Sequence, residues 1–200
     1  YLAEAGAKVE VIDSFYPGAM ASGWTLAGVR QSGRDPAEME MAKKAVKIWE
    51  TLDLHLDTMT GYRQTGNLRL ARTENEAVVI RNLAHSQAAS DLPIELLDIR
   101  QAQQIVPALS DEFLLASWCP TDGHADPLKS VQGFQRAAER LGVTFKIHTT
   151  VTGIDTHTAN GCLRFNAIET VDGSIVAGNA MLATGVQTNL LLGSLGVVFQ

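Results

Sequence analysis

The first thirteen residues constrain the fold of this chain more than any other segment. Residues 1–5 are typical of a last helical turn, and Gly6 is the residue type that most often ends a helix. The β-rich run from Lys8 to Ile12 follows and closes on Asp13. A helix end, a tight turn and a strand that ends in an acid predict the second half of a β-α-β unit.

Further along the chain, four capping patterns predict helix starts, at Asp35, Thr73, Asp98 and Asp126. The first of these helices carries a predicted core stripe made of Met41, Ala45, Ile48, Trp49 and Leu52. Strands are predicted at residues 63–71, 113–118, 143–147, 150–157, 162–170 and 174–177, and a buried strand at 179–183. Strands that alternate with helices, interrupted by a β-rich insertion around 60–121, predict a mixed α/β architecture.

Composition removes several classes of function. Hydrophobic residues make up 46% of the chain and charged residues 19%, which excludes intrinsic disorder. The net charge is −6 and the basic residues are scattered, so nucleic acid and anionic membranes are poor partners. Cys119 and Cys162 lack metal-cage spacing, the histidines are dispersed, and no run resembles a signal peptide or a membrane span. We expect a reduced, cytoplasmic protein without a metal and, since the chain opens on Tyr1, a piece of a longer one.

Asp13 is the first candidate site residue. An acid that closes the second strand of a dinucleotide-binding fold accepts hydrogen bonds from ribose hydroxyls, about 20 residues after a glycine fingerprint. That fingerprint would lie upstream of Tyr1, and no GxGxxG occurs in the chain. The alternative is that Asp13 only caps a surface turn.

Two small-residue segments are also candidates. The loop 17–33, with Ser22, Gly23, Thr25 and Gly28, could offer N–H groups and hydroxyls to a pyrophosphate. Its alternative is an Ω-loop packed on itself. The tripeptide 183–185 follows a predicted strand, where its glycine would let a cofactor approach the backbone; a plain strand-to-helix turn explains it equally well.

The segment TDGHADP (121–127) is the last candidate, because His124 stands directly before a capped helix and can donate, accept or titrate there. Its alternative is structural: Asp-Gly makes a turn and Asp-Pro starts the helix. Cys119 shows no sign of a lowered thiol pKa and is typical of a small buried residue.

Taken in order, three segments resemble the D-amino acid oxidase (DAO) family of FAD-dependent oxidoreductases, and within it the sarcosine oxidase β-subunit and related amine dehydrogenases. They are YLAEAGAKVEVID with PGAMASGWTLAGVRQSGR, then TDGHADP with LGV and TTVTGI, and finally DGSIVAGNAMLATGVQT. The resemblance runs over essentially the whole chain. It implies a Rossmann-like α/β FAD-binding domain of the glutathione-reductase type, incomplete here, with an inserted α+β substrate domain.

The resemblance also implies domain limits and site residues. Residues 1–59 and 122–200 would form the FAD-binding domain, and 60–121 part of the substrate domain. The residues that would contact FAD are Asp13, Ser14, Ser22, Gly23, Ala27, Gly28, Val151, Ala183, Thr184 and Gly185. Those that would lie near the isoalloxazine or the substrate are Arg30, Gln31 and His124.

The function implied is oxidation of the C–N bond of an amino acid or N-alkyl amino acid by hydride transfer to FAD, followed by hydrolysis of the imine. The resemblance also implies a substrate that is an amine or amino acid, and partner subunits or a separate electron acceptor. Three alternatives stay open: an FAD-dependent hydroxy acid or glycerol phosphate oxidoreductase, an NAD-binding protein, and a non-catalytic fragment that binds no cofactor.

Overall fold

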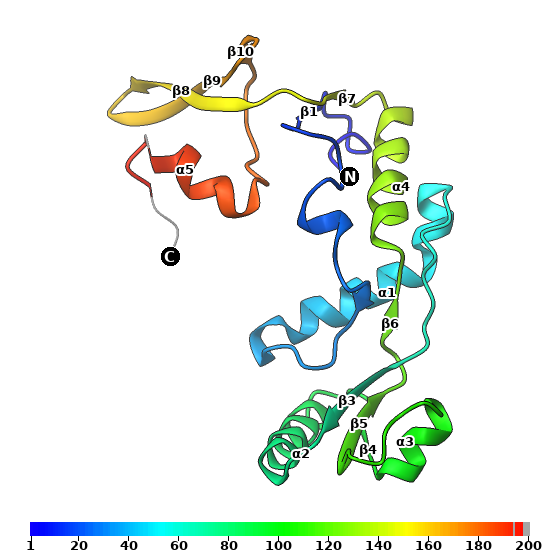
Figure 1. Ribbon diagram of the computed structural model, residues 1–200. Coiled ribbons are helices and arrows are strands. Elements are labelled where there is room, and N and C mark those ends of the chain that lie inside the picture. The colour runs from blue at the N-terminus through cyan, green and yellow to red at the C-terminus, as the bar shows by residue number, and fades with distance from the viewer. Residues whose placement is uncertain (194, 198–200) are drawn as a thin grey trace. The chain divides into compact units, whose positions relative to one another are not determined.

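The computed structural model describes residues 1–193 and 195–197 and divides the chain into two compact units (Figure 1). Unit 1 contains residues 1–19 and 138–200, and unit 2 contains residues 20–137. Helix α4 (Pro127–Arg140) carries the chain from unit 2 back into unit 1. The predicted division at residues 59 and 121 stays a prediction, because compact units are not functional domains.

Unit 1 begins with the predicted helix end. The N–H of Ala7 donates to the carbonyl of Leu2 and the N–H of Gly6 to that of Ala3, with Gly6 at φ 86°, which is the Schellman pattern. Strand β1 (Glu10–Ile12) follows and pairs in parallel with β7 (Thr144–Lys146). These are the strands predicted before Asp13 and after α4, so the parallel arrangement is confirmed.

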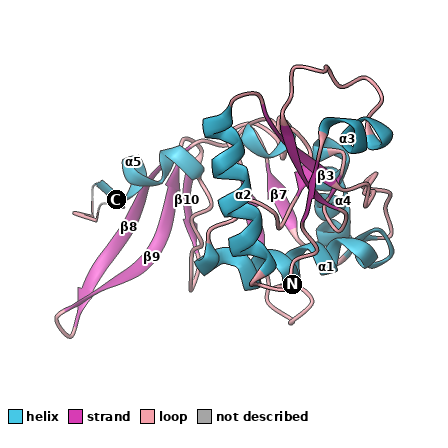
Figure 2. Ribbon diagram, turned by 90° about the horizontal axis from the view of Figure 1, so that it is seen from below, coloured by secondary structure: helices cyan, strands magenta, loops and turns pink. Residues whose placement is uncertain are grey.

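The rest of unit 1 is an antiparallel meander of β8 (Val151–Ala159), β9 (Cys162–Thr170) and β10 (Gly173–Val176), in the order β10-β9-β8. Figure 2 shows it as a long twisted ribbon with α5 (Thr188–Gly193) beside it. A short 3-10 helix, η3 (Gly185–Gln187), precedes α5. The predicted buried strand at 179–183 is wrong: this segment is neither helix nor strand, and Met181 is 79% exposed. An apolar run becomes a buried strand only beside a strand that can pair with it, and among the described residues none pairs there.

Unit 2 contains a three-stranded sheet, made of β3 (Asn67–Ala71), β5 (Leu115–Cys119) and β4 (Glu95–Leu97) in the antiparallel order β3-β5-β4. Helix α2 (Glu74–Ala88) packs on one face through Ala77 and Ile80. Helix α3 (Ile99–Ile105) packs on the other through Ala102. Figure 1 shows the two helices on opposite sides of this sheet. The alternation of side chains along the strands sets these two small cores apart.

The other part of unit 2 begins with η1 (Ala21–Gly23) and β2 (Gly28–Val29), and β2 pairs antiparallel with β6 (Gly123–His124). Helix η2 (Pro36–Glu38) leads into α1 (Met39–Leu56). Val29, Val46 and Ala125 form a buried cluster against which Trp49 and Tyr62 pack. This cluster fixes β2 and β6 on α1 and therefore determines where the loop before β2 ends.

Candidate functional site

Asp13 lies at the carboxyl end of β1, as predicted. Its N–H donates to the carbonyl of Lys146 at 2.9 Å, and its carbonyl accepts the N–H of Thr149 at 3.0 Å, so the backbone is fixed beyond both strands. The side chain accepts the N–H of Phe15 through Oδ1 at 2.8 Å. Among residues 1–193 and 195–197, Oδ2 has no hydrogen-bond partner, and Asp13 is half-buried. One carboxylate oxygen is therefore available to a ligand.

Two further predicted residues, Ser14 and Val151, also belong to unit 1. Ser14 is the next residue after Asp13 and is exposed. Val151 opens β8 two positions after Thr149, the residue whose N–H binds the Asp13 carbonyl. The start of β8 is thus tied to the end of β1, as a site shared by both would require.

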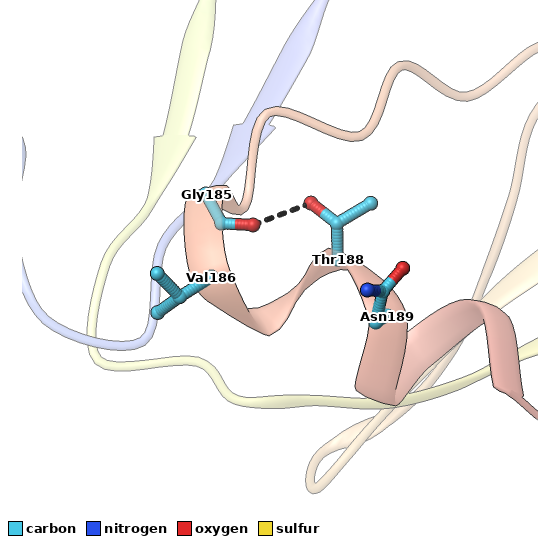
Figure 3. A pocket seen from close by; sticks show the side chains of 4 residues that line it. All are labelled: Gly185, Val186, Thr188 and Asn189. Carbon is cyan, nitrogen blue, oxygen red and sulfur yellow. Dashed lines mark hydrogen bonds between the residues drawn. The ribbon is translucent and has the colours of Figure 1, made fainter. Parts of the chain in front are cut away.

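The segment 183–185 ends at a shallow hollow lined by Gly185, Val186, Thr188 and Asn189 (Figure 3). The Thr188 hydroxyl donates to the Gly185 carbonyl at 2.8 Å and lies 3.0 Å from the Thr184 hydroxyl. Gly185 has φ 53°, a conformation that favours glycine. Ala183 is exposed, and the Thr184 hydroxyl contacts Thr188, the first residue of α5.

In unit 2, the predicted loop residues lie on and after η1. The N–H of Gly23 donates to the Met20 carbonyl, and the N–H of Ala27 to the Thr25 hydroxyl at 3.1 Å. Ala27 has φ 62°, so the chain turns sharply before β2. Ser22 and Gly28 are exposed. The loop is therefore ordered by its own bonds while Ser22 and Gly28 stay accessible.

The structure brings Gly28, Arg30, Gln31 and His124 together through β2 and β6. Gly28 pairs with His124 across the two strands. The Arg30 side chain folds back along Gly28, and its Nε lies 3.3 Å from the position a Gly28 Cβ would take. Gln31 is buried, and its Nε2 donates to the Thr121 hydroxyl at 2.7 Å. The exposed His124 ring places Nδ1 3.1 Å from the Thr65 hydroxyl.

Two other groups near this place have perturbed acidity. Burial raises the pKa of the Cys119 thiol, which disfavours the nucleophilic thiolate. The N–H of Lys129 donates to Asp126 at 3.0 Å and lowers the pKa of that carboxyl, as expected of a helix cap. Among the described residues, no group of three or more His, Cys, Asp or Glu could hold a metal, and no helix is long and apolar enough to cross a bilayer.

Asp122 is the residue that sequence reasoning missed. It is 0% exposed, and its carboxylate accepts the N–H of Gln31 at 2.9 Å, the N–H of Ser32 and the Ser32 hydroxyl. In the sequence it reads as the first residue of an Asp-Gly turn. Its partners lie about 90 positions earlier, so no local pattern could have indicated its role.

Known proteins are similar to this chain over most of its length. Residues 1–199 match the family model described as FAD dependent oxidoreductase (DAO). The D-amino acid dehydrogenase of Methylobacterium radiotolerans is 29% identical over 174 residues, covering 84% of this chain and 39% of that protein. Human dimethylglycine dehydrogenase is 24% identical over 178 residues, covering 84% and 21%.

Among solved structures, L-proline dehydrogenase from P. horikoshii matches with a TM-score of 0.87 and 28% identity, covering 100% of this chain and 52% of that chain. The chain thus spans between about a fifth and about a half of these relatives. The predicted α/β FAD-binding fold, the predicted cofactor and the predicted family of oxidoreductase enzymes are confirmed by these matches. The chain belongs to the DAO family of FAD-dependent oxidoreductases.

Proposed function

We propose that the protein oxidises the C–N bond of an amino acid or N-alkyl amino acid. The observation that carries the proposal is the half-buried Asp13 carboxylate, which presents an unpartnered Oδ2 at the carboxyl end of a parallel strand. The substrate class is supported by the relatives, which are named for D-amino acids, dimethylglycine and L-proline.

The residues fit FAD at the adenosine end. A ribose offers hydroxyl donors, and a carboxylate with a free oxygen is the acceptor that they need. At the loop, Gly28 is exposed, and the Arg30 side chain lies beside the position that a Gly28 Cβ would take. When bound, FAD supplies a hydride acceptor, so that the C–H beside an amine nitrogen can be oxidised to an imine that water hydrolyses.

The chain's own residues bind and orient. We assign Asp13 and Ser14 to the ribose, the backbone of Val151 to the adenine, and the segment 183–185 to the face of the cofactor. In unit 2, Ser22, Gly23, Ala27 and Gly28 are assigned to the pyrophosphate and the flavin. Arg30 provides the positive charge for a substrate carboxylate, with Gln31 and His124 beside it. Positioning of this kind can lower a barrier by about 7–11 kcal/mol.

The finer organisation belongs to the same proposal. Residues 1–59 and 122–200 would serve FAD, and residues 60–121, which include the sheet β3-β5-β4, would belong to an inserted substrate domain. The cysteines are free, which supports a reducing compartment such as the cytoplasm. Electrons would leave to oxygen, a partner subunit or a separate acceptor.

The test uses the protein in the form that its gene encodes. Its visible absorption is recorded, and N-methyl amino acids, D-amino acids, L-proline and hydroxy acids are added without oxygen. We expect flavin bands that bleach with an amino acid. If only hydroxy acids bleach the bands, the substrates are hydroxy acids and not amino acids. A colourless protein that takes up no FAD would overturn the proposal.

Asp13→Ala should weaken FAD binding about tenfold or more, because charge-assisted hydrogen bonds to the ribose are lost. Asp172→Ala is the matched control, since this exposed acid lies in the turn before β10. FAD affinity is measured by titration of the apoprotein. Equal affinities in the two variants would remove Asp13 from the site.

A further inference from the structure

Asp122 is a fully buried acid near the proposed substrate residues. Its carboxylate is the acceptor in each of the hydrogen bonds described below. Oδ1 accepts the N–H of Gln31 at 2.9 Å. The N–H of Ser32 lies 3.4 Å from Oδ1 and 3.3 Å from Oδ2, and the Ser32 hydroxyl donates to Oδ2. Both oxygens are therefore occupied by donors from two consecutive residues.

Neutral donors alone satisfy this buried charge. Among the described residues, no lysine, arginine or histidine forms an ion pair with Asp122. A buried carboxylate is costly unless hydrogen bonds replace its water, and here they do so through the backbone of residues 31–32. The carboxylate can only accept, so the segment cannot turn its N–H groups away without leaving the charge unsatisfied.

The short segment from Asp122 to His124 holds the chain on both sides of Arg30. Gly123 and His124 pair with Val29 and Gly28 through the backbone, while the side chain of Asp122 holds residues 31 and 32. Arg30 stands between these two attachments. Because Val29 is buried and side chains alternate along a strand, Arg30 is directed to the opposite side.

The Arg30 guanidinium has no ion pair or hydrogen bond within residues 1–193 and 195–197. The backbone carbonyl of Arg30 accepts a hydrogen bond from Nε of Arg34. Its side chain lies along Gly28, where a Cβ would be only 3.3 Å from Nε. Arg30 is half-buried, and a guanidinium without a partner is suited to an anionic ligand such as a carboxylate.

We propose that Asp122 is a positioning residue: its buried carboxylate fixes the backbone on the far side of Arg30 and thereby aims the guanidinium at a ligand carboxylate. This inference rests on the proposed function, which supplies the carboxylate as part of an amino acid. Asp122 does not touch the substrate; it acts through Arg30.

The experiment is a double-mutant cycle on the FAD-loaded protein, with wild type, Asp122→Asn, Arg30→Lys and the double variant. The main readout is calorimetric binding of unreactive aliphatic carboxylates, from acetate to butyrate, which needs no turnover. We expect Asp122→Asn to weaken binding about tenfold. In the Arg30→Lys background we expect the same change to have less than a third of that effect, because the group that it aims is gone.

Asp126→Asn is the matched control, since this acid caps α4 four positions along the chain and does not contact residues 30–32. It should leave carboxylate binding within twofold of wild type. FAD content and the thermal midpoint, recorded for every variant, identify a merely structural loss. If Asp122→Asn does not fold, Ser32→Ala replaces it in the cycle, because it removes one donor and keeps the charge.

Additive effects of Asp122 and Arg30 would overturn the proposal, as would wild-type protein that binds no carboxylate. The proposal is also wrong if Asp122→Asn loses FAD and thermal stability while its affinity for carboxylates is unchanged. If carboxylates bind with the expected coupling but no amino acid is oxidised, the proposed function fails while the role of Asp122 holds. If amino acids are oxidised and Asp122→Asn binds carboxylates like wild type, the reverse is true.

Discussion

At the scale of single residues, Gly66 shows how closely the sheet of unit 2 is packed. A Cβ built on Gly66 would lie 1.8 Å from Trp118, and its φ of 78° disfavours any other residue. Gly66→Ala should therefore destabilise the protein by roughly 2–4 kcal/mol, from backbone strain and displacement of the indole. Gly161→Ala, with φ 75° and open space around it, is the control for strain alone. Denaturant unfolding measures both, and equal losses would mean that the contact with Trp118 is unimportant.

Tyr62 carries a buried hydroxyl that has no hydrogen-bond partner among the described residues. Tyr62→Phe removes this unsatisfied group and keeps the ring against Trp49, whose centroid lies 5.8 Å away. We expect a gain of about 1 kcal/mol in the free energy of unfolding. Tyr62→Leu, which also loses the ring contact, should be less stable than wild type.

Alkaline pH provides a second test of Tyr62. Burial first, and then the charge of Glu50, raise the pKa of the phenol, while the nearby Gln64 side chain lowers it by less. A raised pKa means that the stability this group contributes is complete below its unfolded value and is lost as the pH rises through the folded value. The advantage of Tyr62→Phe should thus grow in alkaline solution, as followed by unfolding at increasing pH. If the difference in free energy of unfolding between Tyr62→Phe and wild type stays constant with pH, this expectation is wrong.

At the scale of elements, the helix caps were the most predictable features. Asp35 accepts the N–H of Ala37, and Thr73 and Asp98 form capping boxes with Glu76 and Gln101. These are local patterns, so the sequence alone reveals them. The predicted core stripe of α1 was partly wrong, because Met41 is 71% exposed while Met39, Val46 and Leu56 are buried. The helix is apolar on more than one side, and β2 and β6 select the face that packs.

Strands and the site were predictable to a different extent. The meander of β8, β9 and β10 was predicted because its hairpins are local, whereas β4 was missed because three residues carry little periodicity. The sequence places Asp13 correctly at the end of its strand, whereas its role in FAD binding is a proposal. The contacts of Asp122 with residues 31 and 32 depend on how distant elements fold, so no sequence pattern contains them.

The capping box of α2 leads to a prediction on pH. The N–H groups of Arg72 and Thr73 donate to Glu76 and lower the pKa of its carboxyl. Stability from this bond is present above the unfolded pKa of Glu76 and is lost as the pH falls through the depressed folded value. Glu76→Gln should flatten the acid side of the stability curve, whereas Glu74→Gln, a charge in the same turn, should not. Thermal melts across acidic pH compare them, and Thr73→Ala should cost about 1 kcal/mol at neutral pH.

At the scale of the whole molecule, family membership predicts that FAD and folding are linked. A ligand that binds only the folded protein at 100 times its dissociation constant adds about 2.7 kcal/mol of stability. FAD should therefore raise the melting temperature, more so at higher concentration, in scanning calorimetry of the apoprotein. Adenosine diphosphate, which shares the adenosine end, should give part of this rise. No shift with either ligand would mean that the folded protein binds neither of them at the concentrations used.

The connection between distant segments also determines when each part of the chain can fold. Glu10 on β1 meets Thr144 on β7, 134 positions later, and the Gln31 N–H reaches Asp122 across 91. Closing such long loops costs entropy before any contact forms, whereas capped helices and hairpins need only near neighbours. On the ribosome, the pairing of β1 with β7 can form only after β7 has emerged. The pairing of β1 with β7 should therefore form more slowly than the hairpins of β8, β9 and β10.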